Sequence, residues 1–194
     1  MKINKKLLAF SLGDCHINKT GAMSFVHSEK QKEYIEWKYK ELNEFGSKNF
    51  KKINNNGFPA YSFNLKVIEE NKLLRKKLYG IKGHKFYTKE IIGKMDLFCF
   101  AVLYCDDGSL CAKKTKEGKI HAYDLTFSIY GAKEECENLI EKLKKTYELD
   151  FTLKFNKGKY SIRCGTKMAR KFLELIRPLI PDFECFKETK LKHI

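Results

Sequence analysis

Residues 97–110 read LFCFAVLYCDDGSL, and residues 7–17 read LLAFSLGDCHI. In each stretch an apolar run ends in an acidic residue beside a glycine, Asp107 in one and Asp14 in the other. Such a run predicts a buried helix that stops near the glycine. The two acids are 107 − 14 = 93 residues apart, about half of the 194-residue chain, which indicates an internal duplication.

The rest of the sequence predicts the same order of elements in both halves. The first half is expected to contain helices at 4–14, 29–45 and 66–79 and hairpins at 15–28 and 47–65. The second half is expected to contain helices at 94–107, 132–147 and 166–177 and hairpins at 109–130 and 149–164. We therefore predict an α+β fold in which helix–hairpin–helix–hairpin–helix occurs twice about a pseudo-twofold axis, with halves at 1–92 and 93–194 and two antiparallel four-stranded sheets.

The apolar runs carry small residues four positions apart, Ala9 with Gly13 and Ala101 with Cys105. Small residues on one helix face let two helices approach closely. If the two faces pack together, Asp14 and Asp107 come side by side at the negative ends of their helices and repel each other. A hard divalent cation would relieve that repulsion, and oxygen ligands favour Mg²⁺ or Mn²⁺. The alternative is a pair of buried helices with acidic caps, which is disfavoured at a helix C-terminus.

The charge of the chain indicates a polyanionic partner. Lys and Arg total 39 against 24 Asp and Glu, a net charge of +15. Nucleic acid and an anionic membrane both fit this charge, and an AT-rich genome is a third explanation. The lysines alternate along the expected strands instead of lining one amphipathic helix, which argues against a membrane surface.

Other features of the composition restrict the chemistry and the location. The seven cysteines are scattered without a CxxC pair, so we expect free thiols in a reducing compartment. The five histidines form no HxxxH pattern or catalytic triad, which argues against zinc or nucleophilic catalysis. The N-terminal apolar run breaks at Gly13-Asp14, and no cleavage site follows. We therefore expect no signal peptide and an intracellular protein of a prokaryote or an organelle.

Four segments together resemble the LAGLIDADG homing endonucleases, in a branch whose second motif ends in Asp-Asp-Gly. They are LLAFSLGDCHI, SFVHSEKQKEYIEWK, LFCFAVLYCDDGSL and FLELIRPLIPDFECFK, and they occur in the order of that family. The resemblance implies a monomeric, single-chain endonuclease that acts in intron homing and cuts both strands of a long, asymmetric DNA target. It also implies Mg²⁺ as the cofactor, with Mn²⁺ able to substitute, and two sheets that form a saddle on the DNA.

The resemblance implies roles for individual residues near the two motifs. Asp14 and Asp107 would supply the metal-binding carboxylates, and Gly13 and Asp106 would contribute their carbonyl oxygens. Each half would add one basic catalytic residue, for which Lys85 and Lys187 fit best; Lys82 and Lys89 are alternatives to Lys85. The motif's final glycine is replaced by Cys15, and one small packing residue is replaced by Cys105, but neither change removes an oxygen ligand.

The expected hairpins carry hydrogen-bond donors that suit the major groove of double-stranded DNA. The candidates are Asn18, Lys19, Lys48, Lys51, Lys52, Asn54, Lys113, Lys114, Lys116, Lys119, His121, Lys154, Lys157, Lys159 and Arg163. Two other functions remain open on the same scaffold. One is an RNA-splicing maturase that binds intron RNA, and the other is a DNA-binding regulator without cleavage. The presence of both acids favours the nuclease.

Overall fold

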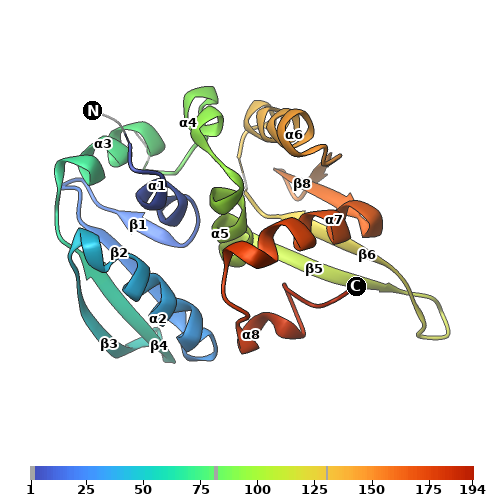
Figure 1. Cartoon of the computed structure of the whole chain (residues 1–194), viewed down its shortest axis with the longest axis horizontal. Coiled ribbons are helices and arrows are strands. Elements are labelled where there is room, and N and C mark those ends of the chain that lie inside the picture. Colours follow the sequence, from blue (N-terminus) through green and yellow to red (C-terminus); the bar gives the residue numbers. More distant parts are fainter. Residues whose placement is uncertain (1–2, 81–82, 130) are drawn as a thin grey trace. The chain divides into compact units, whose positions relative to one another are not determined.

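Two four-stranded antiparallel sheets with helices packed on them form the framework of the structure, a computed structural model that describes residues 3–80, 83–129 and 131–194 (Figure 1). The chain divides into two units. The first comprises Met1–Lys85 with Phe183–Cys185, and the second comprises Phe86–Asp182 with Phe186–Ile194.

The first unit builds its sheet in the order β1-β2-β4-β3. Its elements are α1 (Lys5–Leu12), β1 (Cys15–Ile17), β2 (Met23–Ser28), η1 (Glu29–Gln31), α2 (Lys32–Glu41), η2 (Asn43–Phe45), β3 (Ser47–Asn55), β4 (Phe58–Leu65) and α3 (Glu69–Leu78). Its core contains the stacked rings of Phe25 and Phe63, whose centroids are 4.5 Å apart.

The second unit repeats this order of strands as β5-β6-β8-β7. Its elements are α4 (Lys89–Lys94), α5 (Leu97–Asp107), β5 (Gly108–Lys114), β6 (Ile120–Phe127), α6 (Lys133–Tyr147), β7 (Thr152–Asn156), β8 (Lys159–Gly165), α7 (Thr166–Ile176) and η3 (Arg177–Leu179). The short helix α8 (Glu184–Lys187) crosses the boundary between the units. The matching strand orders confirm the predicted duplication and the α+β fold class.

Some elements differ from those that the sequence predicts. The single helix expected at 29–45 consists of three pieces, and Gly46 ends the last piece in the left-handed region, at φ 74°. Helix α4 was not predicted, because six residues are too few to show a helical period. It begins at Thr88, whose side chain accepts a hydrogen bond from the backbone N–H of Ile91.

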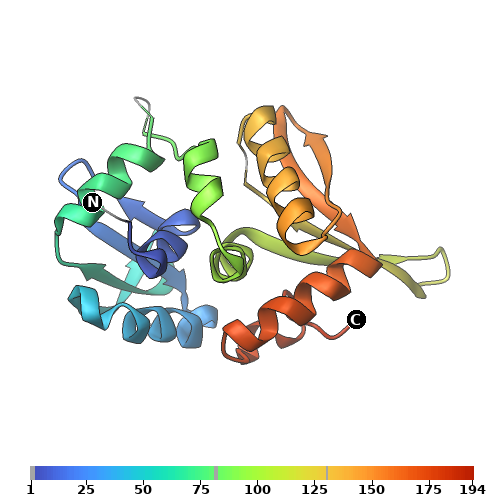
Figure 2. The same ribbon diagram turned by 45° about the horizontal axis from the view of Figure 1, so that its top comes forward.

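Each sheet has one face covered by helices and one open face. In the second unit, α6 and α7 pack on one face (Figure 2), toward which Leu125, Phe127 and Ile162 point. The residues that alternate with them form the open face. We use "open face" for this side of either sheet.

Among the described residues no helix is long and apolar enough to cross a membrane.

Candidate active-site residues in the two units

Asp14 follows helix α1 in the first unit. The helix ends at Leu12 with Gly13 as its cap, and β1 begins at Cys15, so Asp14 lies in the short link between them. Its side chain is 42% exposed. The carboxylate is therefore accessible while its backbone is fixed by a helix on one side and a strand on the other.

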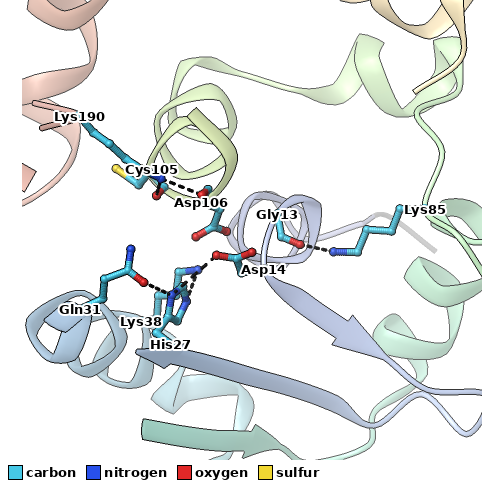
Figure 3. Close-up of polar contacts among 9 residues, drawn as sticks. All are labelled: Gly13, Asp14, His27, Gln31, Lys38, Lys85, Cys105, Asp106 and Lys190. Atoms are coloured by element: carbon cyan, nitrogen blue, oxygen red, sulfur yellow. Dashed lines mark hydrogen bonds and ion pairs between the residues drawn. The ribbon is translucent and has the colours of Figure 1, made fainter. Parts of the chain in front are cut away.

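Lys85 places its ammonium group on the end of α1 (Figure 3). Its Nζ donates to the carbonyl oxygens of Leu12, at 3.2 Å, and of Gly13. A cation on the last carbonyls of a helix satisfies unpaired acceptors and opposes the negative end of the helix dipole. The position of Lys85 is fixed by an antiparallel bridge to Tyr79.

Tyr79 connects this bridge to the strand that follows Asp14. Its hydroxyl accepts from the backbone N–H of Ile17 at 3.0 Å and donates to the carbonyl of Cys15 at 3.3 Å. Burial raises the pKa of Tyr79 to about 12, so the phenol stays protonated and can serve as donor and acceptor at neutral pH.

Lys190 occupies the corresponding place in the second unit (Figure 3). Its Nζ donates to the carbonyl of Cys105 and, at 2.7 Å, to that of Asp106. The hydroxyl of Tyr104 donates to the backbone carbonyl of Lys190 at 2.8 Å and so holds the lysine backbone. Burial raises the pKa of Tyr104 as well.

The two lysine contacts define which residues of the two units correspond. Lys85 binds the carbonyls of residues 12 and 13, directly before Asp14. Lys190 binds the carbonyls of residues 105 and 106, directly before Asp107. Asp107 is therefore the counterpart of Asp14, and Asp106 is the counterpart of Gly13. Asp107 is the last residue of α5 and is half-buried, whereas Asp106 is only 8% exposed.

The lysines expected from the sequence are placed differently in the two units. Lys85 meets the end of α1, whereas Lys187 forms an ion pair with Asp182, at 3.5 Å. Lys190, which the sequence analysis did not single out, meets the end of α5 instead. Of the alternatives, Lys89 is exposed with Glu134 at 3.9 Å, and Lys82 lies outside the described residues.

A buried polar group beside Asp14 was also missed. His27 is 3% exposed, and its Nδ1 lies 3.7 Å from Oδ2 of Asp14 and 3.2 Å from Oε1 of Gln31. Its Nε2 lies 3.1 Å from Nζ of Lys38, a lysine with no exposed surface (Figure 3). One feature of the sequence could have revealed this group. Lys38 lies four residues after the buried Tyr34 and therefore on the inward side of an amphipathic helix.

The expected DNA-binding residues divide into those on an open face, those in turns and those on the helix-covered side. Strand register places Lys48 and Lys51 on the open face of the first sheet, and Lys113, Lys154, Lys159 and Arg163 on that of the second. Asn18, Lys19, Lys114, Lys116, Lys119 and Lys157 lie in or beside hairpin turns. Lys52, Asn54 and His121 alternate with open-face positions and so point to the other side.

On the open face of the second sheet one acid holds two cationic side chains. Oδ2 of Asp124 lies 3.3 Å from Nη1 of Arg163 and 3.2 Å from Nζ of Lys113. Beside them is a cavity of about 400 Å³, whose lining includes Thr126, Lys154 and Lys159. The face therefore combines positive charge with fixed hydrogen-bond donors.

Comparisons with known proteins agree with this architecture. The sequence profile of the LAGLIDADG DNA endonuclease family matches residues 10–172. Among solved structures, the homing endonuclease I-WcaI bound to its DNA recognition sequence superposes with a TM-score of 0.77, at 22% identity, over 99% of this chain and 88% of that one.

Two further structures are similar at lower levels. The N-terminal LAGLIDADG domain of DUF199/WhiA matches with a TM-score of 0.53, at 12% identity, over 90% of this chain and 83% of that one. Mesophilic variants of the homing endonuclease I-DmoI match with a TM-score of 0.50, at 14% identity, over 89% and 93%. No curated protein shows significant sequence similarity to the chain. At these identities the structures establish the fold.

Proposed function

Because the chain belongs to the LAGLIDADG DNA endonuclease family, we propose that it is a homing endonuclease that hydrolyses both strands of a long, asymmetric DNA site. The proposal includes a divalent metal ion, Mg²⁺ or Mn²⁺, bound by the carboxylates of Asp14 and Asp107. The observation that carries it is the repeated helix end: in each unit a lysine binds two carbonyls, and an acid follows directly.

The donors at these helix ends fit a hard cation. The proposed donors in each unit are one carboxylate, on Asp14 or Asp107, and the carbonyl that precedes it, on Gly13 or Asp106. Carboxylate and carbonyl oxygens are the ligands that Mg²⁺ prefers. A carbonyl oxygen has two lone pairs, so the hydrogen bond from Lys85 or Lys190 leaves one lone pair for a metal.

The residues of the chain then have separate tasks in phosphodiester hydrolysis. A bound divalent ion would acidify a water molecule and stabilise the leaving oxygen. Asp14 and Asp107 would hold that ion by charge. The ammonium groups of Lys85 and Lys190 lie at the same helix ends and can neutralise charge that develops on a scissile phosphate or orient a water molecule.

The two open faces are proposed to contact the DNA. Open-face side chains such as Lys51, Lys154 and Arg163 would bind phosphates or base edges, and the lysines in the hairpin turns would reach the flanking backbone. Because the two units differ in sequence at these positions, the target is expected to be asymmetric. Both acids belong to one chain, so we expect a monomer that binds one duplex, which light scattering of the free protein and its complex will test.

The deciding experiment compares metal ions on one DNA target selected from a randomised library. Ca²⁺ is expected to support specific binding without cleavage, because it is larger and takes more ligands with looser geometry than Mg²⁺. Addition of Mg²⁺ or Mn²⁺ should start cleavage of both strands. Cutting in EDTA would overturn the metal-dependent mechanism. Specific binding without cutting in any ion would favour the DNA-binding regulator, and preference for intron RNA over the selected DNA would favour the maturase.

A further inference from the structure

Lys38 and His27 form a buried polar pair beside Asp14. Lys38 has no exposed surface, and its Nζ is 3.1 Å from Nε2 of His27 and 4.5 Å from the centroid of the Tyr34 ring. The side chain of His27 is 1% exposed, whereas that of Asp14 is 42% exposed. The pair therefore links the interior of the first unit to a carboxylate at its surface.

The contacts have a simple donor and acceptor pattern when Lys38 carries its usual ammonium group. That group has three donors and no acceptor, so Nε2 of His27 then accepts from Lys38. The ring proton is then on Nδ1, and the imidazole is neutral. Nδ1–H faces two acceptors, Oε1 of Gln31 at 3.2 Å and Oδ2 of Asp14 at 3.7 Å. The Nδ1 hydrogen bond therefore goes to Gln31, and the Asp14 carboxylate lies just beyond hydrogen-bond distance on the same side of the ring.

The second unit has apolar residues in the corresponding positions. Cys15 pairs with Phe25 in the first sheet, and Gly108 pairs with Phe127 in the second. His27 lies two residues after Phe25, and the residue at the same offset from Phe127 is Ile129, just beyond the end of β6.

The helices correspond in the same way. The buried positions Ile35, Lys38 and Leu42 of the first unit have the same spacing as Cys136, Leu139 and Leu143 of the second. The counterpart of Lys38 is therefore Leu139.

The fold alone does not explain this pair. Burial of an ammonium group costs free energy, and a buried charged group is often replaced by an apolar one without loss of stability. The second unit builds the corresponding helix with Leu139, and Ile129 follows the end of β6. The polar pair occurs in the unit where it lies beside a proposed metal-binding acid, with Nδ1 of His27 3.7 Å from Oδ2 of Asp14, which points to a role in the site instead of the core.

We propose that His27 and Lys38 are positioning residues for Asp14. Nδ1 of His27 faces the carboxylate at 3.7 Å and restricts its rotamers, while Lys38 orients His27 through Nε2 and places positive charge behind the acid. The inference rests on the proposed function, because it concerns how Asp14 is prepared for the metal. Hydrogen-bonded partners of metal-binding side chains typically contribute about 10- to 100-fold to metal affinity or activity.

The central test installs the second unit's residues in the first, as the double variant Lys38→Leu, His27→Ile. We expect its melting temperature to be unchanged or higher and its DNA affinity in Ca²⁺ to stay within about twofold. Its cleavage rate constant in Mg²⁺ should fall about 10- to 100-fold, and half-maximal cleavage should need more Mg²⁺. Lys38→Met provides a second variant with a side chain of similar length.

The matched control is Leu139→Met, at the corresponding buried position of the second unit, which should leave cleavage unchanged. Stable variants that cut as fast as the wild type would overturn the inference. Loss of melting temperature in step with loss of cleavage would also overturn it, because the pair would then serve the fold. The parallel variant Asp14→Asn separates the two ideas: if it cuts normally, the proposed metal site has failed, whatever Lys38 and His27 do.

Discussion

The ammonium nitrogen of Lys190 lies 2.7 Å from the carbonyl oxygen of Asp106, at the end of α5. We expect Lys190→Met and Lys85→Met each to lower the cleavage rate about 10- to 100-fold. Loss of the cation at a helix C-terminus should cost about 0.3–1 kcal/mol of stability. The measurements are cleavage kinetics at saturating DNA and denaturant unfolding. Lys187→Met is the control and should cut within about twofold of the wild type; a larger loss there than at position 190 would contradict the assignment.

Adjacent acids at the end of α5 give a second prediction. Asp107→Asn and Asp14→Asn should each abolish double-strand cleavage and leave binding in Ca²⁺ largely intact, because an amide cannot supply the charge that holds a divalent ion. Asp106→Asn keeps the carbonyl and should lose much less activity. Supercoiled-plasmid cleavage separates nicked from linear product. Stronger loss in Asp106→Asn than in Asp107→Asn would reverse the roles of the two acids.

Cysteine chemistry can locate the DNA-binding face. Cys111 is exposed and pairs with Asp124 across the open face of the second sheet. Burial raises the pKa of Cys136 to about 11 and that of Cys164 to about 12, which disfavours their reactive thiolates. A thiol reagent should therefore label Cys111 early and these two only after unfolding. Bound DNA should protect Cys111, as peptide mapping of the labelled protein will show; equal labelling with and without DNA would count against this face.

Salt dependence distinguishes lysines on the two sides of the sheets. Lys154→Ala should reduce the slope of log K against log salt by about 0.9 if this open-face lysine neutralises one phosphate. Lys52→Ala should leave the slope unchanged, because Lys52 points to the helix-covered side and pairs with Glu29 at 2.5 Å. Fluorescence anisotropy titrations at several salt concentrations provide the measurement. Equal slopes for the wild type and Lys154→Ala would exclude that phosphate contact.

The strand register of β3 shows why these two sides could not be separated from the sequence. Strict alternation would place Lys48 and Lys52 on one face, because they are four residues apart. A register shift between Lys48 and Lys51 changes the pairing, and Asn49 adopts a φ of 60° there. Such a bulge exchanges the two faces, so that Lys51 instead of Lys52 shares the open face with Lys48. The turn residues and the neighbouring helices predicted where the strands lie. A bulge within a strand, however, leaves no clear pattern in the sequence.

The candidate site is visible in the sequence only where its proposed residues are local. Asp14 and Asp107 stand beside glycines at the ends of apolar runs, a pattern that can be read directly. Lys85 follows its acid by 85 − 14 = 71 residues and Lys190 by 190 − 107 = 83, so the repeat spacing does not identify the second lysine. The contact of His27 with Lys38 depends on how α2 packs on β2, which periodicity cannot specify.

The return of Phe183–Cys185 to the first unit affects how the protein can be divided. The ring centroid of Phe183 lies 5.2 Å from that of Tyr34 and 5.4 Å from that of Trp37. The backbone N–H of Glu184 donates to Oε2 of Glu33 at 3.0 Å. A chimera made by joining residues 1–85 to the second half of another endonuclease would lose these contacts. An exchange of halves between endonucleases should therefore transfer Phe183–Cys185 together with the amino-terminal half, although the two segments are separate in the sequence.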